Sequence, residues 1–169
     1  MNAVLYPLDR VELDGKTIFL GMDWAEAEQV LGAGSRVRGR HYYFNNELAI
    51  DCDADNKVCF IEFLGGFSGK IKPTIYDVSA FEADAEELVE VLSRKNGGVV
   101  REVEKDHCIE FLKICVGVHR ELAPAEIIEM ERDMRADGIP AEGNLDLERD
   151  RESARHWSSI GIGIVEYYE

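Results

Sequence analysis

The stretch DCDADNKVCFIE at residues 51–62 has the ligand spacing of a calcium-binding loop. Its acidic residues fall at positions 1, 3, 5 and 12 of such a loop: Asp51, Asp53, Asp55 and Glu62. A calcium loop of this type needs a helix on each side, whereas the residues flanking this one alternate like strands. Position 6 is Asn56 instead of glycine. We therefore predict a hairpin turn without metal, and keep a calcium-binding module at 51–62 as the second alternative.

The four histidines are His41, His107, His119 and His156, and none has a metal-ligand spacing such as HxH or HExxH. The chain also lacks a Gly-x-Ser-x-Gly elbow and a phosphate-binding loop. We expect no catalytic residue, metal or cofactor. The first alternative is a small hydrolase or isomerase, whose site would combine His41, His119 and nearby carboxylates on the concave face of a sheet.

Two acidic runs and a terminal tyrosine pair are the candidate partner-binding residues. The first run carries Glu82, Asp84, Glu86, Glu87 and Glu90. The second carries Asp146, Glu148, Asp150 and Glu152, interleaved with arginines. Exposed carboxylates of this density suit a basic protein partner, and Tyr167 and Tyr168 would supply aromatic anchors. A solvated helix face is the plainer interpretation of each acidic run, and the tyrosines are equally compatible with a core or a sheet edge.

The overall charge limits the class of partner. Lys and Arg number 19 and Asp and Glu number 34, which gives a formal charge of −15. Such a surface repels phosphate backbones and anionic lipid, so we expect neither nucleic-acid nor membrane binding. The start lacks the pattern of a signal peptide, and the four cysteines form no CxxC pair. We expect reduced, buried thiols and a cytoplasmic protein.

Helices are predicted by apolar residues at helical spacing between capping and stop signals. The predicted ranges are 23–31, 79–98, 122–140 and 144–157. In the second range, the stripe Phe81, Ala85, Leu88, Val89 and Leu92 defines the buried face.

Strands are predicted where apolar and polar residues alternate. A hairpin is expected around Asp14-Gly15 in 11–22, a meander in 40–66 and further strands in 99–120. Residues 158–169 are expected to form a final strand whose glycines alternate with Ile160, Ile162 and Ile164. Glycines on one face of a strand indicate a close neighbour or a strong bend. An exposed final strand at 159–168 would also allow a homodimer by edge pairing.

These elements predict an α+β fold in one domain covering residues 1–169. Two similar halves, roughly 11–66 and 76–169, each contain a helix followed by a meander, and residues 67–78 are expected to link them. The simplest packing is one antiparallel sheet with the helices on one face.

Residues 19–63, FLGMDWAEAEQVLGAG…YYFNNELAIDCDADNKVCFIEF, resemble the helix-plus-meander unit of the BamE and β-lactamase-inhibitor-protein superfamily. The matching features are the hydrophobic-Gly-Met entry, the helix ending at Leu-Gly and the acidic hairpin. The resemblance covers about a quarter of the chain. The chain departs from BamE in having no lipoprotein signal.

The whole chain is also similar to small acidic immunity proteins of bacterial polymorphic toxins, including the contact-dependent growth inhibition type. The matching segments are ELAIDCDADNKVCFIEF, YDVSAFEADAEELVEVL, ICVGVHR and HWSSIGIGIVEYY. The resemblance implies a non-enzymatic acidic protein that neutralises a cognate toxin, such as a nuclease, by direct occlusion. It assigns no individual binding residue.

Overall fold

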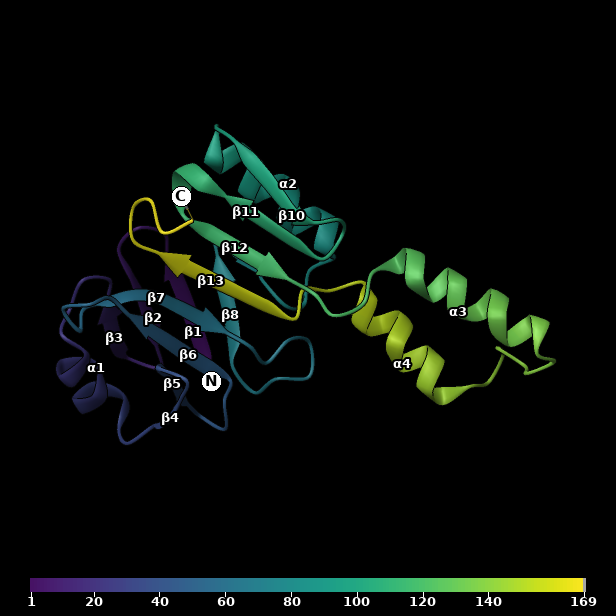
Figure 1. Cartoon of the computed structure of the whole chain (residues 1–169), viewed down its shortest axis with the longest axis horizontal. Helices are drawn as coiled ribbons and strands as arrows, with labels where there is room; N and C mark the ends of the chain where they lie inside the picture. Colours follow the sequence, from purple (N-terminus) through teal and green to yellow (C-terminus); the bar gives the residue numbers. More distant parts are fainter. Residues whose placement is uncertain (169) are drawn as a thin grey trace.

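The computed structural model describes residues 1–168 and contains two β-sheets and four α-helices (Figure 1). The helices are α1 (Trp24–Leu31), α2 (Ala85–Asn96), α3 (Pro124–Ala136) and α4 (Leu145–Ala154). A single 3-10 turn, η1 (Leu112–Ile114), interrupts the strands of the second half. The predicted α+β class is confirmed.

The larger sheet has eight antiparallel strands and consists of two meanders. The first follows α1 and contains β4 (Ser35–Val37), β5 (Arg40–Tyr43), β6 (Leu48–Cys52) and β7 (Val58–Phe63). The second follows α2 and contains β10 (Val100–Glu104), β11 (Cys108–Phe111), β12 (Val116–His119) and β13 (Ser159–Gly163). They join where β13 pairs with β7, with Ile162 opposite Ile61. The predicted helix-plus-meander halves are therefore confirmed.

A second sheet of five strands was not predicted. Its strands are β1 (Asn2–Tyr6), β2 (Arg10–Leu13), β3 (Lys16–Phe19), β8 (Lys72–Ile75) and β9 (Val78–Ser79). Only the β2–β3 hairpin was expected. Residues 72–75 lie in the predicted linker but form β8, because this segment pairs in parallel with β1 and buries Pro73 and Ile75. The expectation of a single sheet and a free linker is corrected accordingly.

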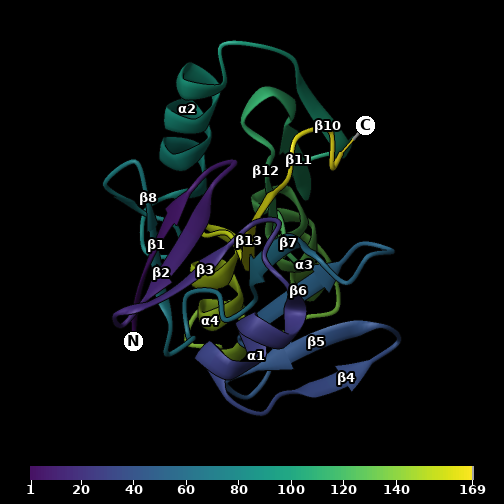
Figure 2. The same ribbon diagram turned by 90° about the vertical axis from the view of Figure 1, so that its left-hand side faces the viewer.

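The main core lies between the two sheets. It includes apolar residues of the five-stranded sheet, the inner face of the eight-stranded sheet and the buried sides of α1 and α2. Both helices therefore lie on one face of the eight-stranded sheet, as predicted (Figure 2), whereas α3 and α4 depart from the prediction and do not pack on this sheet. Ala27 and Leu31 anchor α1, while Leu88 and Leu92 anchor α2.

Helices α3 and α4 form a hairpin inserted between β12 and β13, and it projects away from the sheets (Figure 1). The hairpin has a small core of its own, in which Ile127, Leu147 and Ala154 are buried. Both helices lie within the predicted ranges. None of the four helices in residues 1–168 combines the length and the apolar character that a membrane crossing requires.

Two boundaries differ from the prediction. Helix α2 begins at Ala85 instead of residue 79, because Ser79 pairs with Thr74 and the Ala80 N–H donates to the Pro73 carbonyl at 2.8 Å. The final strand ends at Gly163, and the chain then turns back. Both edges of β13 are paired, with β12 and with β7, so the predicted dimer through an exposed final strand is wrong.

Candidate functional site

The first acidic run lies on the exposed side of the N-terminal part of α2 and the residues just before it. Ala85, Leu88 and Leu92 face the core at helical spacing, so the carboxylates between them face solvent. All five carboxylates of the run are exposed: Glu82, Asp84, Glu86, Glu87 and Glu90. Their position near the helix N-terminus is favourable, since the helix dipole places partial positive charge there. The structure therefore places this predicted run on the surface.

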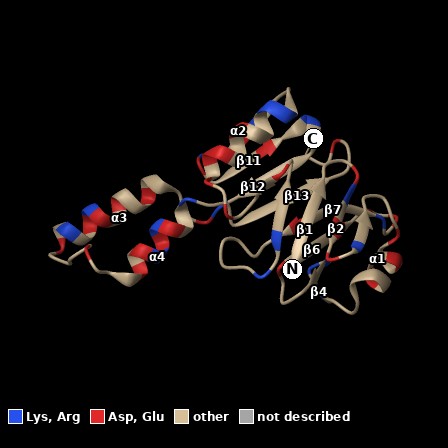
Figure 3. Ribbon diagram, turned by 180° about the vertical axis from the view of Figure 1, so that it is seen from behind, with Lys and Arg blue, Asp and Glu red and all other residues tan. Residues whose placement is uncertain are grey.

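The second acidic run lies along α4 in the projecting hairpin. Asn144 begins the helix, and its side chain accepts hydrogen bonds from the Asp146 and Leu147 N–H groups, each at 3.1 Å. Leu147 and Ala154 are buried against α3. The carboxylates of Asp146, Glu148 and Glu152 are exposed and that of Asp150 is half-buried. Figure 3 shows the acidic residues of α3 and α4 in red, with the basic residues between them in blue.

The two runs meet where the end of α4 contacts the start of α2. Arg155 donates to the Asp84 carboxylate at 2.9 Å, across 71 residues of sequence, and lies 3.6 Å from Glu152. The Ala85 N–H donates to the Arg155 carbonyl at 2.8 Å. The buried Trp157 indole N–H donates to the Ala85 carbonyl at 3.0 Å. We call this contact the α2–α4 junction; it joins the two runs into one acidic surface.

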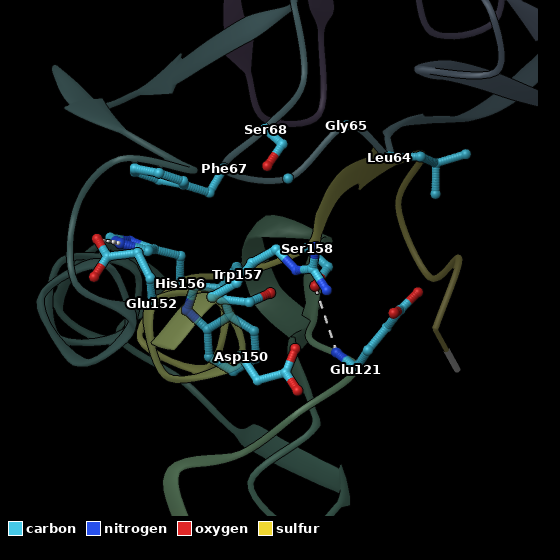
Figure 4. Close-up of a pocket in the computed structure, with 13 residues that line it drawn as sticks. Leu64, Gly65, Phe67, Ser68, Glu121, Asp150, Glu152, His156, Trp157 and Ser158 are labelled. Atoms are coloured by element: carbon cyan, nitrogen blue, oxygen red, sulfur yellow. Dashed lines mark hydrogen bonds and ion pairs between the residues drawn. The ribbon is translucent and has the colours of Figure 1, made fainter. Parts of the chain in front are cut away.

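A cleft of about 470 Å³ opens beside the junction, between residues 64–68 and the end of α4 (Figure 4). Its charged lining consists of three carboxylates, Glu121, Asp150 and Glu152, and one guanidinium, Arg149, so it is acidic overall. Phe67 stacks on the His156 ring with 4.6 Å between centroids. The cleft was missed from sequence, because Phe67 lay in a predicted linker and His156 has no pattern around it.

His156 is held in place within this cleft and has no free ring nitrogen. Its Nδ1 lies 2.9 Å from the Ala83 carbonyl and its Nε2 lies 3.3 Å from Glu152 Oε1. The residue is 4% exposed. A general base needs a nitrogen within reach of substrate, so this geometry suits a structural histidine. The acidic and aromatic lining suits a cationic side chain.

The tyrosine pair lies elsewhere, on the outer face of the eight-stranded sheet. Tyr167 stacks on Phe60 with 4.4 Å between centroids, and Tyr168 meets the same ring edge-on. Both lie over the glycines of β12 and β13; a Cβ on Gly163 would stand 2.7 Å from the Tyr167 Cβ. Burial raises the pKa of both phenols. The structure thus explains the glycines by close aromatic neighbours, and it does not place the tyrosines at the α2–α4 junction.

Arg40 organises the carboxylates beside these aromatic residues. It pairs with Glu62 and lies 3.2 Å from Asp51. Burial disfavours the Arg40 charge, but the two carboxylates outweigh that effect and raise its pKa. Ser159 donates to Glu62 at 2.7 Å. Asp51 and Glu62 are thus occupied by protein groups.

The predicted hairpin turn at 53–56 is confirmed, and the calcium-loop alternative is wrong. Strands β6 and β7 flank the turn where a calcium loop needs helices. The Asp53 carboxylate accepts the N–H groups of Asp55 and Lys57, both at 2.9 Å. Within residues 1–168, no three His, Cys, Asp or Glu side chains converge on a point that could hold a metal ion.

The histidines of the hydrolase alternative lie on opposite faces of the sheet. His41 is opposite Ile50 on the core face, is 6% exposed and stacks on Trp24. His119 is exposed on the outer face, opposite Ser159. Strands β6, β7 and β13 separate them. No shared site can include both side chains.

The buried His41 is expected to make stability depend on pH. Burial lowers its pKa from 6.5, aided by Arg36 and opposed by Glu28 and Asp51. A depressed folded-state pKa means that the stabilisation is complete above the unfolded pKa and is lost as pH falls. We therefore expect wild type to lose more unfolding free energy than His41→Phe between about pH 7.5 and about pH 5. Urea denaturation of both proteins measures this difference, and equal losses would contradict it.

The expectation of buried thiols is confirmed for two of the four cysteines. Cys59 and Cys115 are buried, Cys52 and Cys108 are half-buried, and all four are free. Burial raises the pKa of Cys59 to about 11, with Asp51 adding to the effect. A thiol with such a pKa is protonated at neutral pH and is a poor nucleophile.

Comparisons with protein-family models, with curated proteins and with solved structures find no match for this chain.

Proposed function

We propose that this protein is a non-enzymatic acidic binding protein, an immunity protein that neutralises a cognate toxin by direct occlusion. The observation that carries the proposal is the acidic surface at the α2–α4 junction. Two runs of carboxylates distant in sequence are joined end to end there by Arg155, Asp84 and the buried Trp157. A fixed surface binds with less loss of conformational entropy than a mobile acidic tail.

The chemistry of the surface indicates the partner. Carboxylates on a rigid frame can occupy positions that a basic enzyme cleft, such as that of a nuclease, reserves for phosphates. With a net charge of −15, the chain would also attract such an enzyme at long range and speed their association. The cleft beside the junction, with Glu121 and Glu152 near Phe67, suits a lysine or arginine side chain of that partner.

The architecture is compatible with the resemblance stated from sequence. Each half contains a helix followed by a four-strand meander, as in the unit that residues 19–63 resemble. The hydrolase alternative has no such support, because His41 and His119 lie on opposite faces of the sheet.

Reversing charge on α2 is expected to weaken the complex with the toxin. The test partner is the product of the gene adjacent to this one. We expect Glu87→Lys with Glu90→Lys to raise Kd at least about tenfold at low ionic strength, mostly through a slower association rate. The difference should shrink in high salt, which screens exposed charges. Surface plasmon resonance at two salt concentrations measures both effects, and inhibition of the toxin's activity provides the functional readout.

A matched control carries the same change in net charge at the other end of the molecule. Glu26 on α1 and Asp55 in the β6–β7 turn are both exposed. Glu26→Lys with Asp55→Lys should leave Kd within about twofold, because only screened long-range effects remain. If the adjacent product is not a toxin, or if no complex forms at micromolar concentration, the proposed function is wrong. Equal losses in both double variants would show that net charge matters and the α2 surface does not.

A further inference from the structure

The tip of the α3–α4 hairpin carries an open groove of about 390 Å³ between the two helices and their connecting loop. Its apolar lining consists of Met130, Met134, Ile139 and Leu147. Met130 and Ile139 are 38% and 48% exposed, whereas Leu147 is 4% exposed and forms the floor. The small core of the hairpin therefore remains partly uncovered on this side. Methionine side chains adapt to differently shaped apolar groups, which suits a binding groove.

Aspartates surround this apolar lining. The four that border the groove are Asp133, Asp137, Asp146 and Asp150. Arg149 lies 2.9 Å from Asp146, and Arg132 lies 3.8 Å from Asp133. Both pairs are largely exposed, so they contribute little and are readily exchanged for other partners. The rim thus keeps a negative character around an apolar centre.

We infer that this groove binds a basic amphipathic segment of the protein partner, with an apolar side chain in the groove and lysines or arginines against the aspartates. The inference rests on the proposed function for the existence of a protein partner, and it adds a second contact and the chemistry of the segment that makes it. An apolar centre with a charged rim is the usual arrangement of a protein interface.

Charge complementarity selects this occupant over a second copy of the chain. Residues 124–154 contain ten acidic and four basic residues. Two such hairpins packed groove to groove would bring like charges together, which is destabilising. The rest of the chain is also acidic overall, so a second copy would approach the groove against electrostatic repulsion. Anionic lipid and nucleic acid would be repelled in the same way.

The position of the groove also favours a protein segment. The hairpin extends beyond the sheets (Figures 1 and 3), and all the residues that line the groove belong to this hairpin. Helix α4 carries the second acidic run from the α2–α4 junction to the groove. A partner bound at the junction could therefore reach the groove along the same helix.

Methionine NMR tests the inference with internal controls. The chain has four methionines, of which Met130 and Met134 line the groove, while Met1 and Met22 lie in the body. The probe is a synthetic methionine-free amphipathic helix of leucine and lysine, titrated into protein carrying ¹³C-labelled methionine methyls. We expect the Met130 and Met134 signals to shift and those of Met1 and Met22 to remain. The same helix with glutamate in place of lysine should not bind.

Two variants locate the contact. Ile139→Ser, in the groove, should raise the Kd of the leucine-lysine helix at least about tenfold. Ile128→Ser is the matched control, since Ile128 is 68% exposed on the same hairpin and does not line the groove. It should leave the Kd unchanged. Absence of binding, shifts confined to Met1 and Met22, or equal losses in both variants would overturn the inference.

Two further measurements separate this inference from others. A concentration-dependent dimer of the free chain that Ile139→Ser abolishes would assign the groove to a second copy and overturn the inference. A toxin complex that forms normally with Ile139→Ser would also overturn it, while leaving the proposed function intact. A toxin complex that fails to form with wild type, beside normal binding of the leucine-lysine helix, would reject the proposed function alone.

Discussion

Trp157→Ala is expected to lower the free energy of unfolding by about 3 to 5 kcal/mol, because it removes a large side chain from a closed site. Trp157 is 2% exposed and belongs to the main core. It stands between the end of α4 and the start of β13, and its indole N–H donates to the Ala85 carbonyl at the start of α2. A single truncation therefore leaves a cavity and removes the buried hydrogen bond between the indole and the Ala85 carbonyl.

The loss should extend to Arg120, a buried cation that depends on the same ring. Its guanidinium carbon lies 4.9 Å from the Trp157 ring centroid. Its Nε donates to the Asp106 carbonyl at 2.6 Å and its Nη1 to the Ala154 carbonyl at 3.1 Å. Without the ring, the cation loses an attractive neighbour worth about 1 kcal/mol or more when desolvated. The hairpin and α2 would then be less firmly held at the α2–α4 junction.

Trp157→Phe is the matched control. Phenylalanine fills most of the site but cannot donate to Ala85, so we expect a loss of about 1 to 2 kcal/mol. Urea denaturation followed by far-ultraviolet circular dichroism gives both values without relying on tryptophan fluorescence. A loss below about 1 kcal/mol for Trp157→Ala would show that the site collapses without penalty and that the junction does not depend on this ring.

Local patterns predicted most of the helices and strands. Helix α1 follows from Trp24, Ala27 and Leu31 at helical spacing with Gly32 after them, and the observed helix ends at Leu31. The β6–β7 hairpin follows from alternation on both sides of turn residues that tolerate left-handed backbone, such as Asn56 with φ 56°. In both cases the signal lies within about a dozen residues.

Elements that depend on distant partners were missed. Strand β8 forms because residues 72–75 pair in parallel with β1, a partner about 70 residues away. A short segment containing lysine and proline has no strand pattern of its own, and a parallel pair has no turn to reveal it. For the same reason, residues 79–84 were assigned to the helix. Phe81 is buried as predicted, but it belongs to the loop before α2 and not to the helix.

The same distinction between local patterns and distant contacts applies to the candidate site. Sequence predicted the exposed face of the first run, because the apolar positions of α2 fix the opposite face of that helix. It did not predict that the two runs meet, since the contact between Arg155 and Asp84 spans 71 residues. The aspartate-rimmed groove was also missed. The sequence feature that corresponds to the groove is the presence of Met130 and Ile139 in an otherwise charged segment. This feature indicates a binding groove only when the structure shows that the hairpin projects from the sheets.

Gly161→Ala is expected to cost about 2 to 3 kcal/mol, although alanine normally improves a strand, because the site is already full. Gly161 lies on β13 between β7 and β12, and a Cβ there would clash with the tip of the Phe60 ring. Phe60 is 7% exposed. Its ring cannot swing outward, because the Tyr167 ring stacks on it with 4.4 Å between centroids and the Tyr168 ring packs edge-on against it with 5.9 Å between centroids. Valine at this position should cost more.

A double-mutant cycle identifies the cause. In a Phe60→Ala background the clash is gone, so Gly161→Ala should become neutral or slightly stabilising, which gives a coupling energy of about 2 kcal/mol or more. Gly117→Ala probes the neighbouring contact in the adjacent strand, because its Cβ would meet the hydroxyl and the ring of Tyr168. It should also be destabilising, because Tyr168 is packed against Phe60. Equal costs for Gly161→Ala with and without Phe60 would refute the proposed packing, and with it the explanation of why glycine alternates with isoleucine in this strand.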